Sequence, residues 1–370
     1  MATLQEKYGL LKGLFMGDGT AYIGPFYAAV DITRRCNLHC MGCRYHSTAM
    51  KTIPLQGEQN VLDMSFDLFK HFCDELQTMG TSSLTLIGEG EPLLHPRIFD
   101  MIATAKDAGL FVTLLTNGTL LNERRCQSLI DSRLDSLKVS LWGSSKNVYK
   151  LNFPEGKHGN FEKIINSLRC LSSIKAARKS KWPAMTLHHP INRNNFQHIE
   201  AMINLVHTTG CNALSFSPFH TNRGQLASMA LSSDEELQVC FVLSQMTKRL
   251  NALGIKHNIA PTLFSYRIGE KVWQTFPCYA GWLQLRLKMD GNLLPCYSCH
   301  QPLGNLNERS LHDIWNSAAL KDFRRQTITM EGLTKIGEQC DCAFCCHLND
   351  NWRVHRLFRW ISPTRAIKLI

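Results

Sequence analysis

A repeated alternation of short apolar segments and longer amphipathic segments constrains the fold of this 370-residue chain more than any other feature. Segments rich in β-branched or aromatic residues predict six strands, at residues 26–33, 83–87, 110–115, 136–141, 184–188 and 213–216. Amphipathic segments predict helices between them, at residues 65–79, 95–108, 122–132, 160–176 and 194–209. Such alternation indicates crossover connections and a parallel sheet. Six units are fewer than the eight that close a full barrel, so we predict an α/β fold with a partial (β/α)6 barrel.

Polar or cysteine-rich turns follow the first four predicted strands. Cys36 comes three residues after the first strand ends at Thr33, and Gly88 opens a turn directly after the second. Asn117 follows the third strand, and Ser140 lies near the end of the fourth. The carboxyl ends of parallel strands meet at one edge of a sheet, where ligands bind. We therefore expect these turns to form a single site.

The alternation stops after about residue 224 and a different composition follows. Residues 232–253 predict one long helix with a capping segment at its start, and a cysteine-rich, turn-rich segment begins at about residue 260. We divide the chain into a barrel (1–240), a small cysteine-rich domain (241–350) and a C-terminal tail (351–370).

Charge and hydropathy limit the setting in which the chain works. A net charge of +11 is compatible with an anionic partner, but the sequence contains no nucleic-acid-binding module, so no nucleic acid is expected. No run of eighteen apolar residues is present, and the first residues are charged where a signal peptide would be apolar. We therefore expect a cytoplasmic location, where clustered thiols indicate metal ligands.

The first cysteine group places three thiols, on Cys36, Cys40 and Cys43, within eight residues. A cubane [4Fe–4S] cluster normally takes four cysteines, so three leave one iron open for chemistry. A zinc knot is the alternative, for which His39 and His46 are the nearby candidates for a fourth ligand.

The spacing of these cysteines, directly after a first strand, resembles the signature of the radical S-adenosylmethionine (SAM) superfamily. The resemblance implies that Cys36, Cys40 and Cys43 bind a [4Fe–4S] cluster whose open iron binds SAM. It also implies that reductive cleavage of SAM yields a 5′-deoxyadenosyl radical, which abstracts hydrogen from a substrate. The residue before the third cysteine is usually aromatic in that family and packs near the adenine, whereas this chain has Gly42.

The turn after the second strand resembles the glycine–glycine–glutamate–proline turn of the same family, with Glu89 in place of the first glycine. Glycines permit close backbone approach, and a carboxylate such as that of Glu91 can receive the SAM ammonium. The resemblance extends to the ends of the third and fourth strands. It implies SAM contacts from Gly88, Glu89, Gly90, Glu91, Pro92, Asn117 and Ser140.

A second cysteine group lies in the C-terminal part and consists of Cys278, Cys296, Cys299, Cys340, Cys342, Cys345 and Cys346. The dipeptide at residues 290–291, Asp-Gly, predicts a hairpin that brings Cys278 and Cys296 within reach of one metal. Cys342 and Cys345 form a CxxC pair that can supply two adjacent ligands. Zinc held by the same four thiols is the alternative.

Short motifs around these cysteines resemble the auxiliary-cluster domains of radical SAM enzymes, known as SPASM and its shortened twitch form: Gly291, Pro295-Cys296, Gly304-Asn305-Leu306 and Ile314-Trp315. The resemblance implies one auxiliary [4Fe–4S] cluster, on Cys278, Cys296, Cys342 and Cys345. The resemblance assigns no ligand role to Cys299, Cys340 and Cys346. The whole fold is then a partial (β/α)6 TIM-like barrel with a small C-terminal cysteine-rich auxiliary-cluster domain.

An auxiliary cluster that accepts the electron left on a substrate radical implies a net two-electron oxidation. We favour a small metabolite, such as a sugar or nucleotide-like anion, because the chain is basic. Post-translational modification of a peptide is the alternative, and a non-catalytic iron–sulfur or zinc-binding scaffold is a further one. We assign no catalytic acid or base, because His188, His189 and His220 are more often structural or surface residues at such positions.

Two further partners follow from this interpretation. A radical SAM enzyme needs an electron donor such as flavodoxin or ferredoxin. Basic and aromatic residues alternate from Trp352 to Trp360, which predicts either a packed terminal helix or contact with an anionic membrane surface or a partner.

Overall fold

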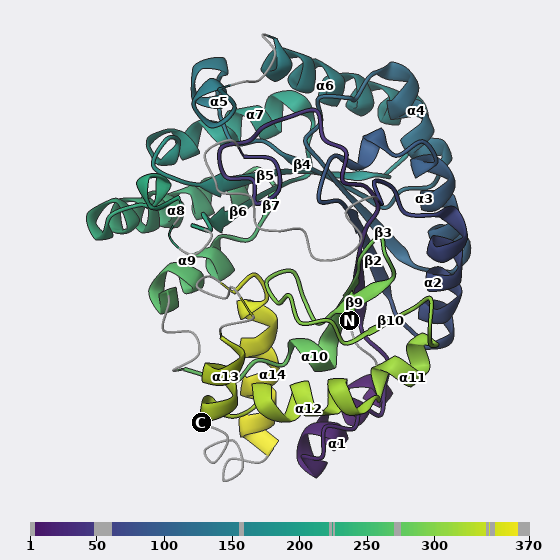
Figure 1. The fold of residues 1–370 in the computed structure, drawn as a ribbon. Helices are drawn as coiled ribbons and strands as arrows, with labels where there is room; N and C mark the ends of the chain where they lie inside the picture. The colour runs from purple at the N-terminus through teal and green to yellow at the C-terminus, as the bar shows by residue number, and fades with distance from the viewer. Residues whose placement is uncertain are drawn as a thin grey trace.

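The computed structural model describes residues 4–47, 61–154, 159–221, 224, 226–269, 275–337, 340 and 345–361. These residues build one ten-stranded sheet with the strand order β10-β9-β8-β1-β2-β3-β4-β5-β6-β7. The sheet curves, and the helices that connect its strands cover its outer side (Figure 1).

All six predicted strands are present: β1 (Tyr27–Asp31), β2 (Ser83–Ile87), β3 (Phe111–Thr116), β4 (Ser136–Ser140), β5 (Ala184–Ile191) and β6 (Ala213–Pro218). Each pairs in parallel with the next along the chain. The prediction of a parallel, barrel-like sheet is therefore confirmed. A short seventh strand, β7 (Lys256–His257), extends the sheet beyond β6.

The helices of the barrel are α2 (Phe66–Thr78), α3 (Ile98–Asp107), α4 (Glu123–Asp131), α5 (Lys146–Asn152), α6 (Asn160–Ala177) and α7 (Met202–Thr209), with the 3-10 turns η1 (Pro92–Leu94) and η2 (Phe196–Ala201) and an N-terminal α1 (Leu4–Met16). Local chemistry fixes where several of them begin. The Ser65 side chain accepts from Leu68 N–H at the start of α2, and Asn122 accepts from Arg125 N–H at the start of α4.

The strand faces differ in burial. On β4, Leu137 and Val139 are fully buried beneath the helices, whereas Lys138 and Ser140 are half-buried on the inner face. This period of two gives the barrel a dry outer core and a more polar inner face.

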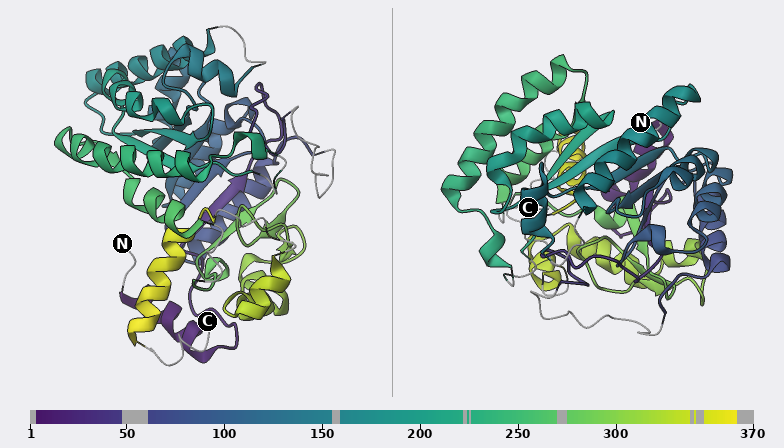
Figure 2. Two further views of the ribbon diagram at one scale, coloured as in Figure 1. Left: turned by 90° about the vertical axis from the view of Figure 1, so that its left-hand side faces the viewer. Right: turned by 90° about the horizontal axis from the view of Figure 1, so that it is seen from above.

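The C-terminal part contains η3 (Ala227–Met229), α8 (Ser233–Ala252), α9 (Ile259–Ile268), α10 (Ala280–Leu283), β8 (Gln284–Leu287), β9 (Asn292–Leu294), β10 (Gly304–Asn305), α11 (Leu311–Trp315), α12 (Ala318–Thr327), α13 (Met330–Ile336) and α14 (Leu348–Ile361). Helices α11 to α14 lie together at one end of the molecule (Figures 1 and 2).

The predicted hairpin is present, and it joins the barrel. Strands β8 and β9 are antiparallel, and Gly291 in the turn between them has a φ of +86°, which favours glycine. Strand β8 also pairs in parallel with β1. The sheet is therefore continuous between the two predicted domains, and the predicted boundary at residue 240 falls inside α8.

The described part of the predicted tail is helical. In α14, Phe358 and His355 are buried, whereas Trp360 is 85% exposed.

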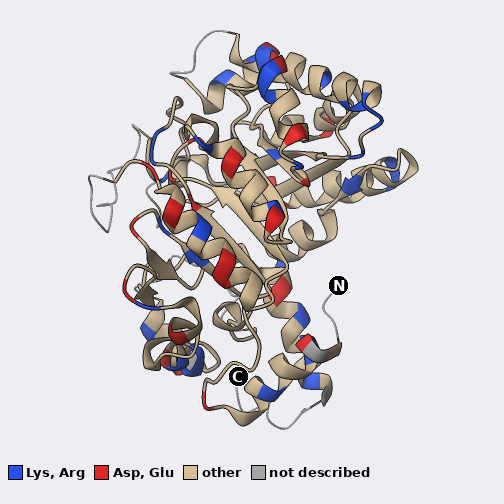
Figure 3. Ribbon diagram, turned by 90° about the vertical axis from the view of Figure 1, so that its right-hand side faces the viewer, with Lys and Arg blue, Asp and Glu red and all other residues tan. Residues whose placement is uncertain are grey.

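None of the helices within the described ranges is long and apolar enough to cross a membrane. Acidic and basic positions are interspersed on the face that Figure 3 presents, so the excess positive charge does not form one patch there.

Candidate functional site

The loop after β1 carries the three predicted cluster ligands. Cys36, Cys40 and Cys43 are half-buried and form no disulfide bond. The Cys43 N–H donates to the Cys40 carbonyl at 3.0 Å, which tightens the loop. The backbone N–H groups of Tyr45 and His46 lie 3.4 and 3.3 Å from the Cys43 Sγ. The loop therefore directs donors at a sulfur that would carry negative charge as a metal ligand.

Burial raises the pKa of all three thiols. The pKa of Cys36 rises to about 11, and the nearby Glu91 and Cys43 contribute to the rise. The pKa of Cys40 rises well above its usual value, chiefly through desolvation and also through Cys43 and Cys36. The thiols thus lie close enough to oppose one another's ionisation, and they could ionise together only beside positive charge. An iron–sulfur cluster supplies that charge, so the residues present fit it.

The zinc alternative would need a different arrangement of the same thiols from that of a cluster. In the part of the chain that the structure describes, no three cysteine, histidine, aspartate or glutamate side chains gather closely enough to hold a single metal ion. A zinc ion needs all its ligands within about 2.3 Å of one point. In a cubane each thiolate binds a different iron, which requires wider spacing.

The turn after β2 packs against the chain that leads to Cys36. The Gly90 N–H donates to the Thr33 carbonyl at 3.0 Å, and the Glu91 N–H donates to the Arg35 carbonyl at 2.8 Å. A Cβ at Gly90 would collide with the Arg35 carbonyl, so this close approach requires glycine.

Glu91 ties two strand ends together. Its buried carboxylate accepts hydrogen bonds from the Leu93 N–H (3.0 Å), the Thr116 hydroxyl (2.6 Å) and the Asn117 N–H (2.7 Å). Burial raises the Glu91 pKa although these donors act in the opposite direction. A carboxylate has about four acceptor positions, so one remains for a further donor.

Asn117 links the end of β3 to the cysteine loop. Its Nδ2 donates to Asn37 Oδ1 at 3.0 Å, and its Oδ1 accepts from the Thr119 hydroxyl at 2.7 Å. At the end of β4, the Ser140 hydroxyl accepts from Trp142 Nε1 at 2.8 Å. Glu91 and Asn117 therefore link the ends of β1, β2 and β3, and Ser140 ends the neighbouring strand β4.

Aromatic side chains lie beside Gly42. The rings of Trp142 and Phe219 meet edge to face with centroids 5.9 Å apart, and a Cβ at Gly42 would collide with both rings. The aromatic surface near the third cysteine thus comes from the segments after β4 and β6 and not from position 42.

Glu89 belongs to a buried cluster of charges that the sequence analysis missed. Its carboxylate pairs with Arg34 Nε at 2.7 Å and with Lys288 Nζ. Asp31, at the end of β1, accepts two hydrogen bonds from Arg286, at 2.7 and 2.8 Å. The available signal was the alternation in residues 284–289, which places Arg286 and Lys288 on one face of a buried strand.

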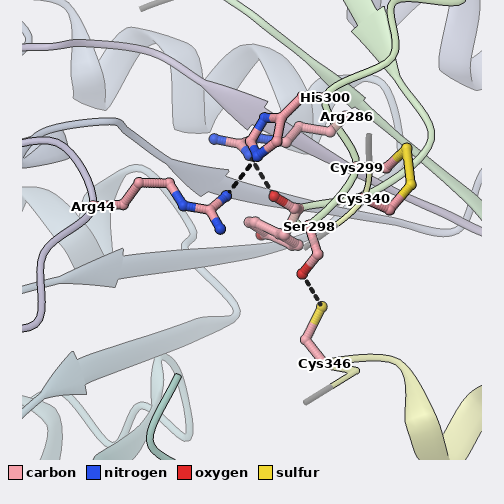
Figure 4. The surroundings of a disulfide bond; sticks show 8 residues. Arg44, Arg286, Ser298, Cys299, His300, Cys340 and Cys346 are labelled. Atoms are coloured by element: carbon pink, nitrogen blue, oxygen red, sulfur yellow. Dashed lines mark hydrogen bonds between the residues drawn. A yellow bond between two sulfur atoms is a disulfide. The ribbon is translucent and has the colours of Figure 1, made fainter. Parts of the chain in front are cut away.

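In the C-terminal group, Cys278, Cys296 and Cys346 come together. Desolvation, followed by the influence of the other thiols, raises the pKa of Cys278 and Cys296 to about 12. Desolvation also raises the pKa of Cys346 to about 11, although that residue as a whole is exposed. The Cys346 Sγ lies 4.0 Å from the Ser298 hydroxyl, so the thiol faces inward (Figure 4).

The remaining cysteines of this group differ from one another. Cys299 and Cys340 form a disulfide (Figure 4). The Cys345 thiol accepts from Asn351 Nδ2 at 3.6 Å. Cys342 lies outside the described residues, so the predicted ligand set stays a prediction.

Comparison with known proteins agrees with this geometry. The sequence matches the Radical SAM superfamily over residues 30–206, which includes the first cysteine group and the first four strand ends. It matches SPASM, an iron–sulfur cluster-binding domain, over residues 278–347. The chain therefore contains a radical SAM domain and a C-terminal SPASM domain. Its cofactors are accordingly a [4Fe–4S] cluster, SAM and auxiliary iron–sulfur clusters.

Relatives differ in what they act on. The chain is 29% identical to an AdoMet-dependent heme synthase of Methanosarcina barkeri, over 87% of this chain and 91% of that protein. It is 23% identical to a PqqA peptide cyclase of Granulibacter bethesdensis, over 81% of this chain and 76% of that protein. Its fold is similar to that of Streptococcus suis SuiB bound to precursor peptide SuiA, with a TM-score of 0.65 and 14% identity over 92% of this chain and 75% of that chain.

Proposed function

We propose that Cys36, Cys40 and Cys43 hold the SAM-binding [4Fe–4S] cluster and that the chain removes hydrogen from a substrate held on the inner face of the barrel. When bound, the cluster and SAM supply a carbon radical that abstracts hydrogen, and the auxiliary cluster supplies an acceptor for the second electron. The observation that carries the proposal is the set of three half-buried free thiols in one loop at the edge where the ends of β1, β2 and β3 meet.

The neighbouring turns position SAM. Gly90 brings its backbone against the cysteine loop, and Glu91 uses its remaining acceptor position for the SAM ammonium. Gly88, Pro92, Asn117 and Ser140 complete the SAM contacts. Glu89 acts in a different way: both of its carboxylate oxygens face protein cations, so it fixes the turn.

The auxiliary cluster is held by Cys278, Cys296 and Cys346, with Cys342 or Cys345 as the fourth ligand. The mutual influence of the first three thiols supports this set over one that omits Cys346. The SPASM match over residues 278–347 supports a cluster-binding domain in this part of the chain, and the boundaries at residues 240 and 350 stay predictions from the sequence.

The reaction is a net two-electron oxidation of a small metabolite. The basic charge of the chain supports an anionic substrate, and the likeness to a heme synthase extends over most of both proteins. The second candidate is peptide modification, which the likeness to the PqqA peptide cyclases favours. Flavodoxin or ferredoxin donates the electron, and a cytoplasmic location and a membrane contact of the C-terminal tail stay predictions from the sequence.

The test is SAM cleavage by anaerobically reconstituted protein. With a strong reductant, the protein will form 5′-deoxyadenosine, and Cys36→Ala, Cys40→Ala or Cys43→Ala will abolish it. Cys73→Ala, which removes a buried thiol of α2, is the matched control and will leave it intact. Two cubane clusters predict about eight irons per chain. Protein loaded with about eight irons that forms no 5′-deoxyadenosine would contradict the proposal.

A further inference from the structure

The inner face of β4, β5 and β6 carries polar side chains below the strand-end contacts that are assigned to SAM. Ser140 pairs across the strands with His188, and His188 pairs with Ser215. Lys138 lies two residues before Ser140 on the same face of β4. At about 3.3 Å per residue, Lys138 is about 7 Å deeper in the barrel than the strand end where SAM contacts are expected.

Lys138 differs from the other lysines that are withdrawn from solvent. Lys106 contacts Asp135 at 2.7 Å, Lys175 donates to the Pro183 carbonyl at 2.6 Å, and Lys288 pairs with Glu89. Lys138 is half-buried and makes no hydrogen bond or ion pair with any residue that the structure describes. Desolvation lowers its pKa, and no carboxylate counteracts this.

The described side chains beside Lys138 on the inner face of β5 and β6 include His188, Ser215 and Ser217, which are polar and carry no negative charge. His188 Nδ1 lies 2.9 Å from the Ser215 hydroxyl, and its Nε2 lies 3.4 Å from the Ser217 hydroxyl. Burial lowers the His188 pKa well below its usual value, and the positive charge of Lys138 contributes, which places the two side chains near each other. Lysine is ordinarily far more basic than histidine, so Lys138 is the more basic group of this pair.

An unpaired ammonium withdrawn from water is costly unless an anion comes to meet it. We infer that Lys138, with His188, Ser215 and Ser217 beside it, binds a carboxylate group of the substrate deep in the barrel. One ammonium matches the single charge of a carboxylate, and the hydroxyls can donate to its second oxygen. A phosphate dianion would leave one charge without a partner. The inference rests on the proposed function for its substrate, but it concerns a separate group of residues.

The same carboxylate chemistry could come from SAM itself. The depth of Lys138 favours the substrate, because the SAM contacts lie at the strand ends. The test separates the two sources with glutarate as the carboxylate probe, glutaramide as its uncharged analogue, and SAM alone.

The first measurement is the acetylation rate of individual lysines in the loaded wild-type protein, read by mass spectrometry after brief treatment with N-hydroxysuccinimidyl acetate. Glutarate will slow acetylation of Lys138 at least threefold, whereas glutaramide and SAM alone will leave it unchanged. Lys248, exposed on α8, will respond to none of them. Absence of glutarate protection, or protection by SAM alone, would overturn the inference.

The second measurement is glutarate binding by calorimetry. Lys138→Met will weaken it about tenfold or more, Lys138→Arg will restore most of it, and Lys248→Met will match wild type. The iron content and the urea unfolding curve of Lys138→Met will match wild type, which shows that the variant folds and loads its clusters. Equal affinity in Lys138→Met and wild type would refute the assignment. Failure of wild-type SAM cleavage, in contrast, would refute the proposed function and leave the glutarate result interpretable.

Discussion

Replacing Arg286 by methionine tests whether the buried ion pair between β1 and β8 holds the barrel to the SPASM domain. The Arg286 side chain is 4% exposed and that of Asp31 is fully buried. Arg286 donates to both Asp31 oxygens, at 2.7 and 2.8 Å, and approaches the Tyr297 carbonyl and the Tyr45 hydroxyl at 3.3 Å. Methionine keeps most of the apolar stem and removes all of these donors.

The expected cost follows from what remains around Asp31. Removing one partner of a buried ion pair typically costs about 3–5 kcal/mol, because the other charge stays desolvated. Lys288 remains 4.0 Å from Asp31, although Glu89 also pairs with it, so the lower end of this range applies. We expect Arg286→Met to lose about 3 kcal/mol in the free energy of unfolding.

The assay is urea unfolding of the iron-loaded proteins under anaerobic conditions. The double variant Asp31→Asn with Arg286→Met will recover at least half of the loss, because no uncompensated charge is left. Arg178→Met is the control: its pair with Asp131, at 2.5 Å, is exposed, and its loss should cost less than about 1 kcal/mol. Equal destabilisation by Arg286→Met and Arg178→Met would refute the reasoning.

Three further predictions concern acid stability, the aromatic pocket and the auxiliary ligands. Burial lowers the pKa of His189 to about 4 from an unfolded value of 6.5. The unfolded state therefore binds the proton first, and the free energy of unfolding decreases as the pH drops from 6.5 towards 4. His189→Asn should reduce the loss between pH 7 and 4 by up to about 3 kcal/mol in urea unfolding, and an unchanged loss would contradict this origin. Gly42→Phe, which introduces the aromatic residue usual at that position, should lower 5′-deoxyadenosine formation at least tenfold, because Trp142 and Phe219 already fill the space; an active variant would show that the rings can move aside. Cys346→Ser should lose about four irons per chain, as should Cys278→Ser, and full iron content in Cys346→Ser would remove Cys346 from the ligand set.

The strands and most barrel helices could be predicted because their signals are local. Apolar periodicity and capping residues such as Ser65 and Asn122 depend only on nearby sequence. The position of Cys36, directly after a strand, likewise follows from local order. Glu91 was predictable as a carboxylate at a strand end, but two of its three protein donors, Thr116 and Asn117, come from the end of another strand.

The contacts that the sequence could not reveal join segments far apart in the chain. Strand β8 pairs with β1 although more than 250 residues separate Arg286 from Asp31, and no local pattern encodes that register. The same holds for Trp142 and Phe219 beside Gly42, which only the folded chain brings together. Glu89 was assigned to SAM from its place in a motif, whereas its partners Arg34 and Lys288 come from other segments.

The most direct test of the central claim is electron–nuclear double resonance of the reduced, iron-loaded protein with SAM labelled with ¹⁵N at its amino group. The account predicts a hyperfine coupling between the label and the cluster in wild type, retained in Cys346→Ser and absent when Cys36, Cys40 and Cys43 are replaced by alanine. A fully loaded wild-type protein that binds SAM without any coupling to the label would contradict it.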